Sequence, residues 1–268
     1  EEVSPESSSF EEATTTEISS VELPPGMNCD LSSPNTRCEI DGSIYNDSIM
    51  IEINLTQFSG LSETSDYGAA IHLINYGLYC HQSNFTGCHA IGGGAIYIYI
   101  EKNYPRNVTF YDIQFLENEA YFGGALFIYS TQESNDVHIE LCTFNKNRAS
   151  KKPREGDSDH LCGGGALYLQ TVKSDVINCS FTHNIGSGVK VYNNFDKPTP
   201  SGKRLSALSS DNDGSLVSIK DCFFEISKED ESSSSLFYVR GDQKEVPVEV
   251  TNCIFTGDLS KESHHIDG

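Results

Sequence analysis

The sequence predicts an all-β fold, a right-handed parallel β-helix of about seven coils, and three observations support this prediction. The pattern apolar-x-apolar-x-x-small-x-Phe recurs seven times from residue 51 onward. The segments between its copies are rich in β-branched and aromatic residues, which favour strands over helices. Where no insertion intervenes, the copies lie about 28 residues apart, a distance typical of solenoid proteins.

Each copy of the pattern predicts two short strands joined by a corner. Ile51 and Ile53 alternate as the buried side chains of a strand do, and the three-residue step to Thr56 predicts the bend. In a stacked coil, equivalent side chains lie one above another, so the Phe residues are expected to form one interior stack. Its predicted members are Phe58, Phe85, Phe115, Phe144, Phe181, Phe224 and Phe255.

A third strand is predicted in most coils. These strands cover residues 70–73, 95–98, 125–128, 166–169 and 236–239. Each coil is expected to add about 4.8 Å of length. A β-sandwich is the competing all-β fold, but its strands do not carry the same residue at the same place seven times.

The rest of the chain flanks or interrupts this repeat. A Glu-, Ser- and Thr-rich segment at the amino terminus is too polar to form a core and is expected to be disordered. The predicted divisions are a disordered segment 1–26, an N-terminal cap 27–50, a β-helix 51–258 with insertions at 150–162 and 193–214, and a frayed end 259–268.

Asn and Gly residues occupy the predicted corners. Three residues after the Phe, Asn118, Asn147 and Asn184 predict an Asn ladder. Asn tolerates left-handed backbone angles, and its amide can bond the turns above and below. The Gly pairs at 93–94, 123–124 and 164–165 predict tight corners rather than a phosphate loop, because a strand and not a helix follows each.

Nine cysteines without a C-x-x-C pair favour an oxidising compartment over a zinc site. The disulfide candidates are Cys29, Cys38, Cys80, Cys88 and Cys162. A Cys29–Cys38 bridge is expected in the cap, and Cys162 is a candidate to pair with Cys80, with Cys88 or with another chain. For the four cysteines at the repeat's small position, Cys142, Cys179, Cys222 and Cys253, buried thiols are favoured slightly over bridges between coils.

Five N-x-S/T sequons also favour secretion from a glycosylating host. They begin at Asn46, Asn54, Asn84, Asn107 and Asn178. The chain starts Glu1-Glu2-Val3-Ser4 and contains no apolar run of about 18 residues, so a processed ectodomain is expected, with any membrane anchor in the remainder of a precursor. Extracellular or cell-surface localisation follows.

The net charge limits which classes of partner the chain is expected to bind. With 18 basic and 39 acidic residues the net charge is −21, which disfavours nucleic acid. Acidic clusters in residues 150–160 and 211–214 resemble Ca²⁺ loops but lack an EF-hand pattern. No cofactor is expected, and Ca²⁺ is the one candidate ion.

Residues 115–126 read F-L-E-N-E-A-Y-F-G-G-A-L. This stretch resembles the F-x-x-N-x-A-x-x-G-G-A-[ILV] repeat of the polymorphic outer membrane protein family. Residues 144–167 look like a second copy split by an insertion, and residues 85–95 like a third with Cys88 in place of Asn. The resemblance covers residues 50–190 well and 215–258 weakly, where Gly-Gly-Ala is missing. It implies a β-helical surface protein involved in adhesion to host cells, whereas the cysteines and sequons suit a eukaryotic secretory route better.

The sequence therefore predicts a non-enzymatic adhesin or structural β-helix that mediates cell or host attachment. Its expected partner is a surface protein or glycan of a host cell or of its own kind. One alternative is a secreted polysaccharide lyase or glycoside hydrolase of the β-helix class, such as the pectate lyases; such sites need paired carboxylates, which the repeats do not align. The other alternative is a spacer that binds nothing.

Overall fold

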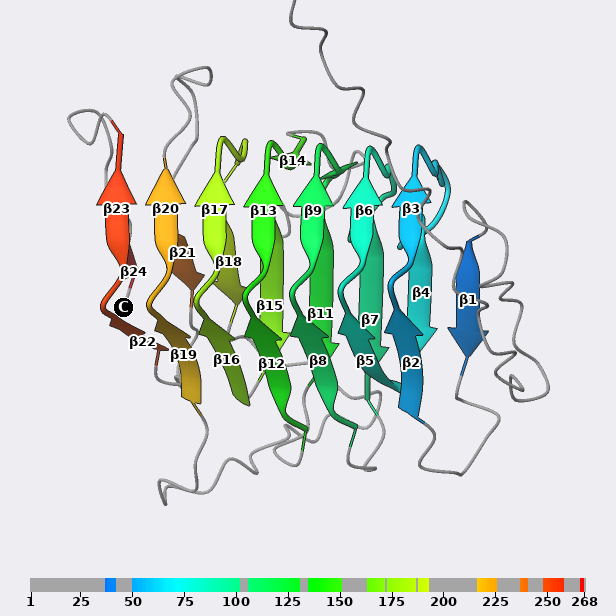
Figure 1. Cartoon of the computed structure of the whole chain (residues 1–268), viewed down its shortest axis with the longest axis horizontal. Coiled ribbons are helices and arrows are strands. Elements are labelled where there is room, and N and C mark those ends of the chain that lie inside the picture. The colour runs from blue at the N-terminus through cyan, green and yellow to red at the C-terminus, as the bar shows by residue number, and fades with distance from the viewer. Residues whose placement is uncertain are drawn as a thin grey trace, which may run out of the picture.

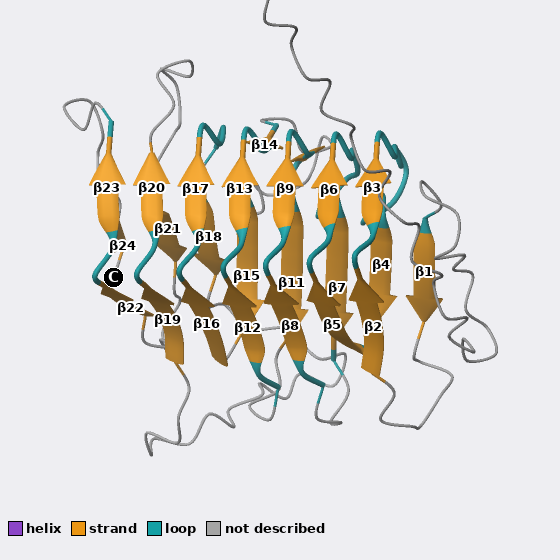
Figure 2. Cartoon of the chain, in the orientation of Figure 1, coloured by secondary structure: helices purple, strands orange, loops and turns teal. Residues whose placement is uncertain are grey.

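The computed structural model of the chain is all-β within the residues it describes (Figures 1 and 2). Those residues are 37–41, 50–101, 106–130, 135–150, 163–171, 173–186, 188–192, 216–225, 237–240, 248–257 and 266–267. Within these ranges no helix is long and apolar enough to cross a membrane. The predicted all-β class is confirmed.

Three long parallel sheets run the length of the molecule. Sheet A contains β1 (Cys38–Asp41), β4 (Ile71–Ile74), β7 (Ile96–Ile100), β11 (Leu126–Ser130), β15 (Leu167–Thr171), β18 (Val189–Tyr192), β21 (Phe237–Arg240) and β24 (Ile266–Asp267). Sheet B contains β2 (Met50–Asn54), β5 (Gly77–His81), β8 (Val108–Tyr111), β12 (Val137–Glu140), β16 (Lys173–Ile177), β19 (Leu216–Lys220) and β22 (Val248–Thr251). Sheet C contains β3 (Gln57–Ser59), β6 (Asn84–Thr86), β9 (Gln114–Leu116), β13 (Thr143–Asn145), β17 (Ser180–Thr182), β20 (Phe223–Glu225) and β23 (Ile254–Thr256). A short pair, β10 (Glu119–Ala120) and β14 (Arg148–Ala149), lies beside them.

Each strand of a sheet pairs in parallel with the equivalent strand of the next repeat. Phe144, for example, pairs with Phe115 on one side and Phe181 on the other. The chain thus visits the three sheets in turn, and we call one passage through them a unit. Stacked parallel sheets of this kind are compatible with a β-helix or another solenoid.

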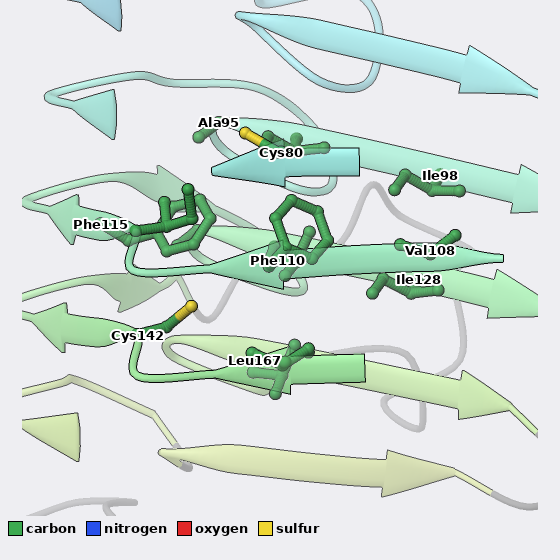
Figure 3. Packing of buried hydrophobic residues seen from close by; sticks show 14 of the residues in the cluster. Cys80, Ala95, Ile98, Val108, Phe110, Phe115, Ile128, Cys142 and Leu167 are labelled. Atoms are coloured by element: carbon green, nitrogen blue, oxygen red, sulfur yellow. The ribbon is translucent and has the colours of Figure 1, made fainter. Parts of the chain in front are cut away.

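The predicted Phe stack is present in sheet C. All seven rings are stacked, with neighbouring centroids 4.8 to 5.2 Å apart and ring planes within 16° of parallel. Inward residues of the other sheets complete the core, and Figure 3 shows Phe110, Phe115 and Leu167 within it. Side chains along a strand point alternately to the two faces of the sheet. In-register pairing therefore places the apolar residues of every unit on the same face.

The corner between sheets B and C is the most regular feature of the backbone. One residue in each of the seven units adopts a positive φ of 48° to 56° there. These residues are Leu55, Gln82, Asp112, Leu141, Asn178, Asp221 and Asn252. Non-Gly residues seldom adopt this conformation, so hydrogen bonds from each corner to the next, such as Leu55 N–H to His81 O at 3.3 Å, help to hold it.

The expectation that the ladder asparagines themselves tolerate the left-handed conformation at the other corner was wrong. The residues before them adopt it instead: Glu117, Lys146 and His183 have φ of 55° to 56°. With the bend completed one residue earlier, the Asn side chain is buried and free to bond the backbone of neighbouring units. The Gly pairs behave as predicted: Gly93 has φ 59°, and a Cβ on Gly94 would lie 2.1 Å from the Gly124 carbonyl oxygen.

Two strands of sheet A lie in the segments predicted as a cap and as a frayed end. The segment predicted as a separate cap supplies β1, which pairs with β4 and so extends sheet A. The segment predicted as a frayed end contains β24, which pairs with β21. Parallel pairing requires only a few residues in register, which is too short a signal to detect in sequence. Residues 1–26, 151–162 and 193–214 lie outside the described residues.

Candidate interaction surface

Aromatic side chains gather on the outer face of sheet A. In β7 the isoleucines point into the core, so the alternating Tyr97 and Tyr99 point outward. Tyr97 stacks on Phe127 with centroids 4.8 Å apart, Phe127 stacks on Tyr168 at 4.8 Å, and Tyr99 stacks on Tyr129 at 4.6 Å. We call these five residues the outer aromatic ladder.

Residues of the adjoining corner extend the outer aromatic ladder. Tyr67 stacks on Tyr97 at 4.5 Å, and Phe122 meets the edge of Phe127 at 5.2 Å. Phe127, Tyr129 and Tyr168 are buried. The half-buried residues of this surface are Tyr67, Tyr97, Tyr99 and Phe122. Burial raises the pKa of the Tyr97 hydroxyl, which therefore stays protonated at neutral pH as a hydrogen-bonding group. The accessible part of this surface thus combines aromatic rings with phenolic hydroxyls.

The ladder ends in a cationic contact at one side. Lys190, the register partner of Tyr168 in β18, places its Nζ 5.4 Å from the centroid of the Tyr168 ring. This distance lies within the range of cation–π attraction.

A charged cluster adjoins the other side of the ladder. Arg37 Nη2 donates to Asp66 Oδ2 at 2.7 Å and to the Tyr67 carbonyl oxygen at 3.0 Å. Its Nη1 donates to Glu63 Oε2 at 3.2 Å. His72 belongs to both groups, since its Nδ1 lies 3.2 Å from Arg37 Nη2 and its ring meets the edge of Tyr97 at 5.3 Å. Arg37 directly precedes β1, so its hydrogen bonds join the start of β1 to the segment that leads into β4.

The acidic groups of this cluster are held ionised. Burial opposes ionisation of Asp66, but the hydrogen bonds from Arg37 and from the Tyr67 N–H outweigh it and lower the pKa. Hydrogen bonds from the Ser65 hydroxyl and N–H lower the pKa of Glu63. A general acid requires the opposite shift, so neither carboxyl is prepared for that role at neutral pH.

Glu39, Asp66 and His72 bring potential metal-ligand atoms within 4.8 Å of one another. The Arg37 guanidinium already supplies the positive charge among these groups, and Ca²⁺ favours six to eight oxygen ligands over a mixed set with imidazole. This cluster therefore gives no support for Ca²⁺. The acidic clusters predicted in residues 150–160 and 211–214 lie outside the described residues, apart from Ser150.

The predicted Asn ladder is present and buried. Asn147 accepts at Oδ1 from the backbone N–H and the Nδ2 of Asn118 at 3.0 and 2.9 Å, and its Nδ2 donates to the Phe115 carbonyl at 3.0 Å. Asn184 repeats these contacts toward Asn147 and Phe144. The ladder satisfies backbone groups inside the fold, and its role is structural.

Two disulfide candidates are corrected by the structure. Cys80 and Cys88 are free and buried, and burial raises the pKa of their thiols to about 12 and about 11. Cys80 lies in the inner row of sheet B between Ile53 and Phe110, where it acts as a small apolar residue. Cys38 is disulfide-bonded. The other two candidates, Cys29 and Cys162, lie outside the described residues.

The four cysteines at the repeat's small position, Cys142, Cys179, Cys222 and Cys253, are free thiols. Cys179 Sγ donates to the Ile177 carbonyl oxygen at 3.2 Å and lies 3.6 Å from that of Ile139 in the preceding unit. Contact with the neighbouring Cys142 thiol, together with burial, raises the pKa of the Cys179 thiol. Thiols of this kind are poor nucleophiles.

Four of the five sequon asparagines are exposed at the surface: Asn54, Asn84, Asn107 and Asn178. Asn46 lies outside the described residues. The outer aromatic ladder was not predicted, although the alternation I-Y-I-Y-I at residues 96–100 is its signal in the sequence.

In comparisons with known proteins, no family model, no curated protein and no solved structure matches this chain.

Proposed function

We propose that the chain is a right-handed parallel β-helix that acts without catalysis as an adhesive module on an extracellular surface. In this proposal the contact surface is formed by the half-buried members of the outer aromatic ladder, Tyr97 and Tyr99, and by its half-buried flank, Tyr67 and Phe122. The partner is a surface protein or glycan of another cell. The polymorphic outer membrane protein family, whose repeat the sequence resembles, is the proposed relative.

The accumulation of aromatic rings on the outer face of one sheet carries this proposal. An outward-facing strand position exposed to water is ordinarily polar, and the first three strands of sheet C follow that rule with Gln57, Asn84 and Gln114 in one row. Sheet A instead places Tyr97 and Phe127 at equivalent outward positions. Aromatic residues are enriched at protein interfaces, and stacked rings are rigid, so binding orders them at little entropic cost.

Two further observations support the extracellular setting. Cys38 is disulfide-bonded, which is typical of an oxidising compartment. The described sequon asparagines are all exposed, as acceptor sites for glycans must be.

The proposal is tested by measuring binding of the full chain to a panel of cultured animal cells and to a glycan array. Saturable binding is expected, with at least a ten-fold loss in Tyr67→Ala and Phe122→Ala. Tyr111→Ala is the matched control, because Tyr111 is 39% exposed on the outer face of sheet B, and this variant is expected to bind normally.

Other outcomes would favour the alternatives. A folded chain that binds no cell and no glycan would be a spacer. Release of new reducing ends from acidic polysaccharides would make it an enzyme.

A further inference from the structure

The asparagines of the ladder and the asparagines of the described sequons differ in burial. Asn118, Asn147 and Asn184 are buried in the ladder, and none of them begins a sequon. Asn54, Asn84, Asn107 and Asn178 all begin sequons and are exposed. The side chains of these four sequon asparagines can therefore carry a bulky group without disturbing the core.

Three of these exposed asparagines line the corner between sheets B and C. Asn54 is the last residue of β2, and Asn84 is the first residue of β6. Asn178 is the positive-φ corner residue between β16 and β17. Asn54 thus holds the last position of a sheet B strand, Asn178 holds the corner residue that follows such a strand, and Asn84 holds the first position of a sheet C strand. The three side chains thus occupy one edge of the molecule in different units.

The fourth site lies at the other end of a sheet B strand and is more restrained. Asn107 directly precedes β8 of sheet B, and its Oδ1 accepts from the Asp136 N–H at 3.4 Å. The described strands of sheet A, which carry the outer aromatic ladder, contain no sequon. The acceptor sites and the aromatic surface therefore lie on different sheets.

We propose that Asn54, Asn84 and Asn178 carry N-linked glycans, which form a carbohydrate coat along the B–C corner and leave sheet A bare. In the transfer, the Asn Nδ2 bonds to C1 of the first sugar of a lipid-pyrophosphate-linked oligosaccharide. The bond from C1 to the pyrophosphate oxygen breaks, the lipid pyrophosphate leaves, and the amide loses one proton.

Such a coat directs how a partner can approach. Neighbouring units are about 4.8 Å apart, so glycans on Asn54 and Asn84, in adjacent units, would cover the corner and the faces beside it. The half-buried aromatic residues on and beside sheet A, Tyr67, Tyr97, Tyr99 and Phe122, remain accessible for a contact. This inference rests on the proposed extracellular function, because it requires passage through a glycosylating secretory route.

The test is glycopeptide mapping of the full chain secreted from eukaryotic cells behind a cleavable signal peptide, with enzymatic deglycosylation in ¹⁸O-water to mark occupied sites. Occupancy is expected at all three positions, and N54Q, N84Q and N178Q should each remove one glycan. Asn252 is the matched control, because it occupies the same corner position as Asn178 without a sequon. N252Q should leave the mass of the glycans unchanged, whereas I254T, which creates a sequon at Asn252, should add one glycan.

The outcomes separate this inference from the proposed function. Secreted, folded protein that is unmodified at Asn54, Asn84 and Asn178 overturns the coat. Glycosylated protein that binds no cell supports the coat and removes the adhesive function. Loss of cell binding after enzymatic deglycosylation would overturn the placement of the contact on sheet A, because the glycans themselves would then make it.

Discussion

The central units and the last unit follow the same sequence pattern but differ in burial. Ile219 and Phe224 are fully buried, whereas their register partners Val250 and Phe255 are both 40% exposed. The chemistry of the side chains is equivalent, so the difference comes from the neighbouring unit. In a stacked fold, each unit is covered by the next one along, and an apolar residue is only as buried as the unit above it allows.

The two ends of the stack also differ from each other. In the first unit Ile51, Ile53 and Phe58 are at most 5% exposed, whereas in the last unit Val250 and Phe255 are each 40% exposed. The amino-terminal end of the core is therefore covered and the carboxyl-terminal end is open. Substitutions at equivalent positions should have unequal effects, and each of the following predictions uses that inequality.

The largest effect is expected from a charge in the centre of the Phe stack. Phe144→Asp places a carboxylate between the rings of Phe115 and Phe181, where no partner can compensate its desolvation, so the chain should fail to fold. Phe255→Asp, the same change in the open last unit, should keep a native circular dichroism spectrum. A folded Phe144→Asp variant would show that the stack is dispensable.

A smaller loss is expected from removal of one rung of the Asn ladder. Asn147→Ala leaves the Asn118 amide and the Phe115 carbonyl without their partner, which should lower the free energy of unfolding by about 2 to 4 kcal/mol in urea titrations. The control is Asn145→Ala, two residues away in β13 and outside the ladder, which should stay within about 1 kcal/mol of the parent. Equal effects at the two positions would contradict a special role for the ladder.

Thiol access should follow the same gradient from centre to end. In the native protein Cys253, which is only partly buried, should react with an alkylating reagent before the fully buried Cys142, Cys179 and Cys222. Mass spectrometry of peptides from a labelling time course measures the order. Simultaneous labelling of all four thiols in native conditions would mean that the central units open as readily as the last one.

The smallest effect on stability is expected from a change of pH, which acts on His72 near the amino-terminal end of the stack. Burial lowers the pKa of His72 from 6.5, so the unfolded chain binds a proton there more readily than the folded chain does, and stability falls as pH drops below 6.5. The lowered pKa of Asp66 adds a second loss below about pH 3.8. Thermal melts between pH 7.5 and 5 should show a Tm decrease of a few degrees, and His72→Gln should flatten it. A Tm that is constant over this range in the parent chain would contradict the burial of His72.

Some features of the fold were predictable because each copy of the repeat contains the residues that determine them. The apolar-x-apolar alternation and the recurring Phe placed the strands of sheets B and C, and Gly pairs marked corners where a Cβ would meet backbone, as at Gly94. The strand β1 and the Arg37 cluster were not predictable. Arg37 lies 29 residues from Asp66, and only the pairing of β1 with β4 brings them together.

The sequence by itself determined which side chains face inward and which positions stack, because a period of two within strands and a constant distance between repeats leave one consistent register. Only the tertiary structure decided how buried each of those positions is, and which outward residues form a surface. Tyr97, Phe127 and Tyr168 are about 30 and 41 residues apart along the chain, and their rings stack only because parallel pairing places their strands side by side. Burial and surface both depend on contacts between units, which no single copy of the repeat contains.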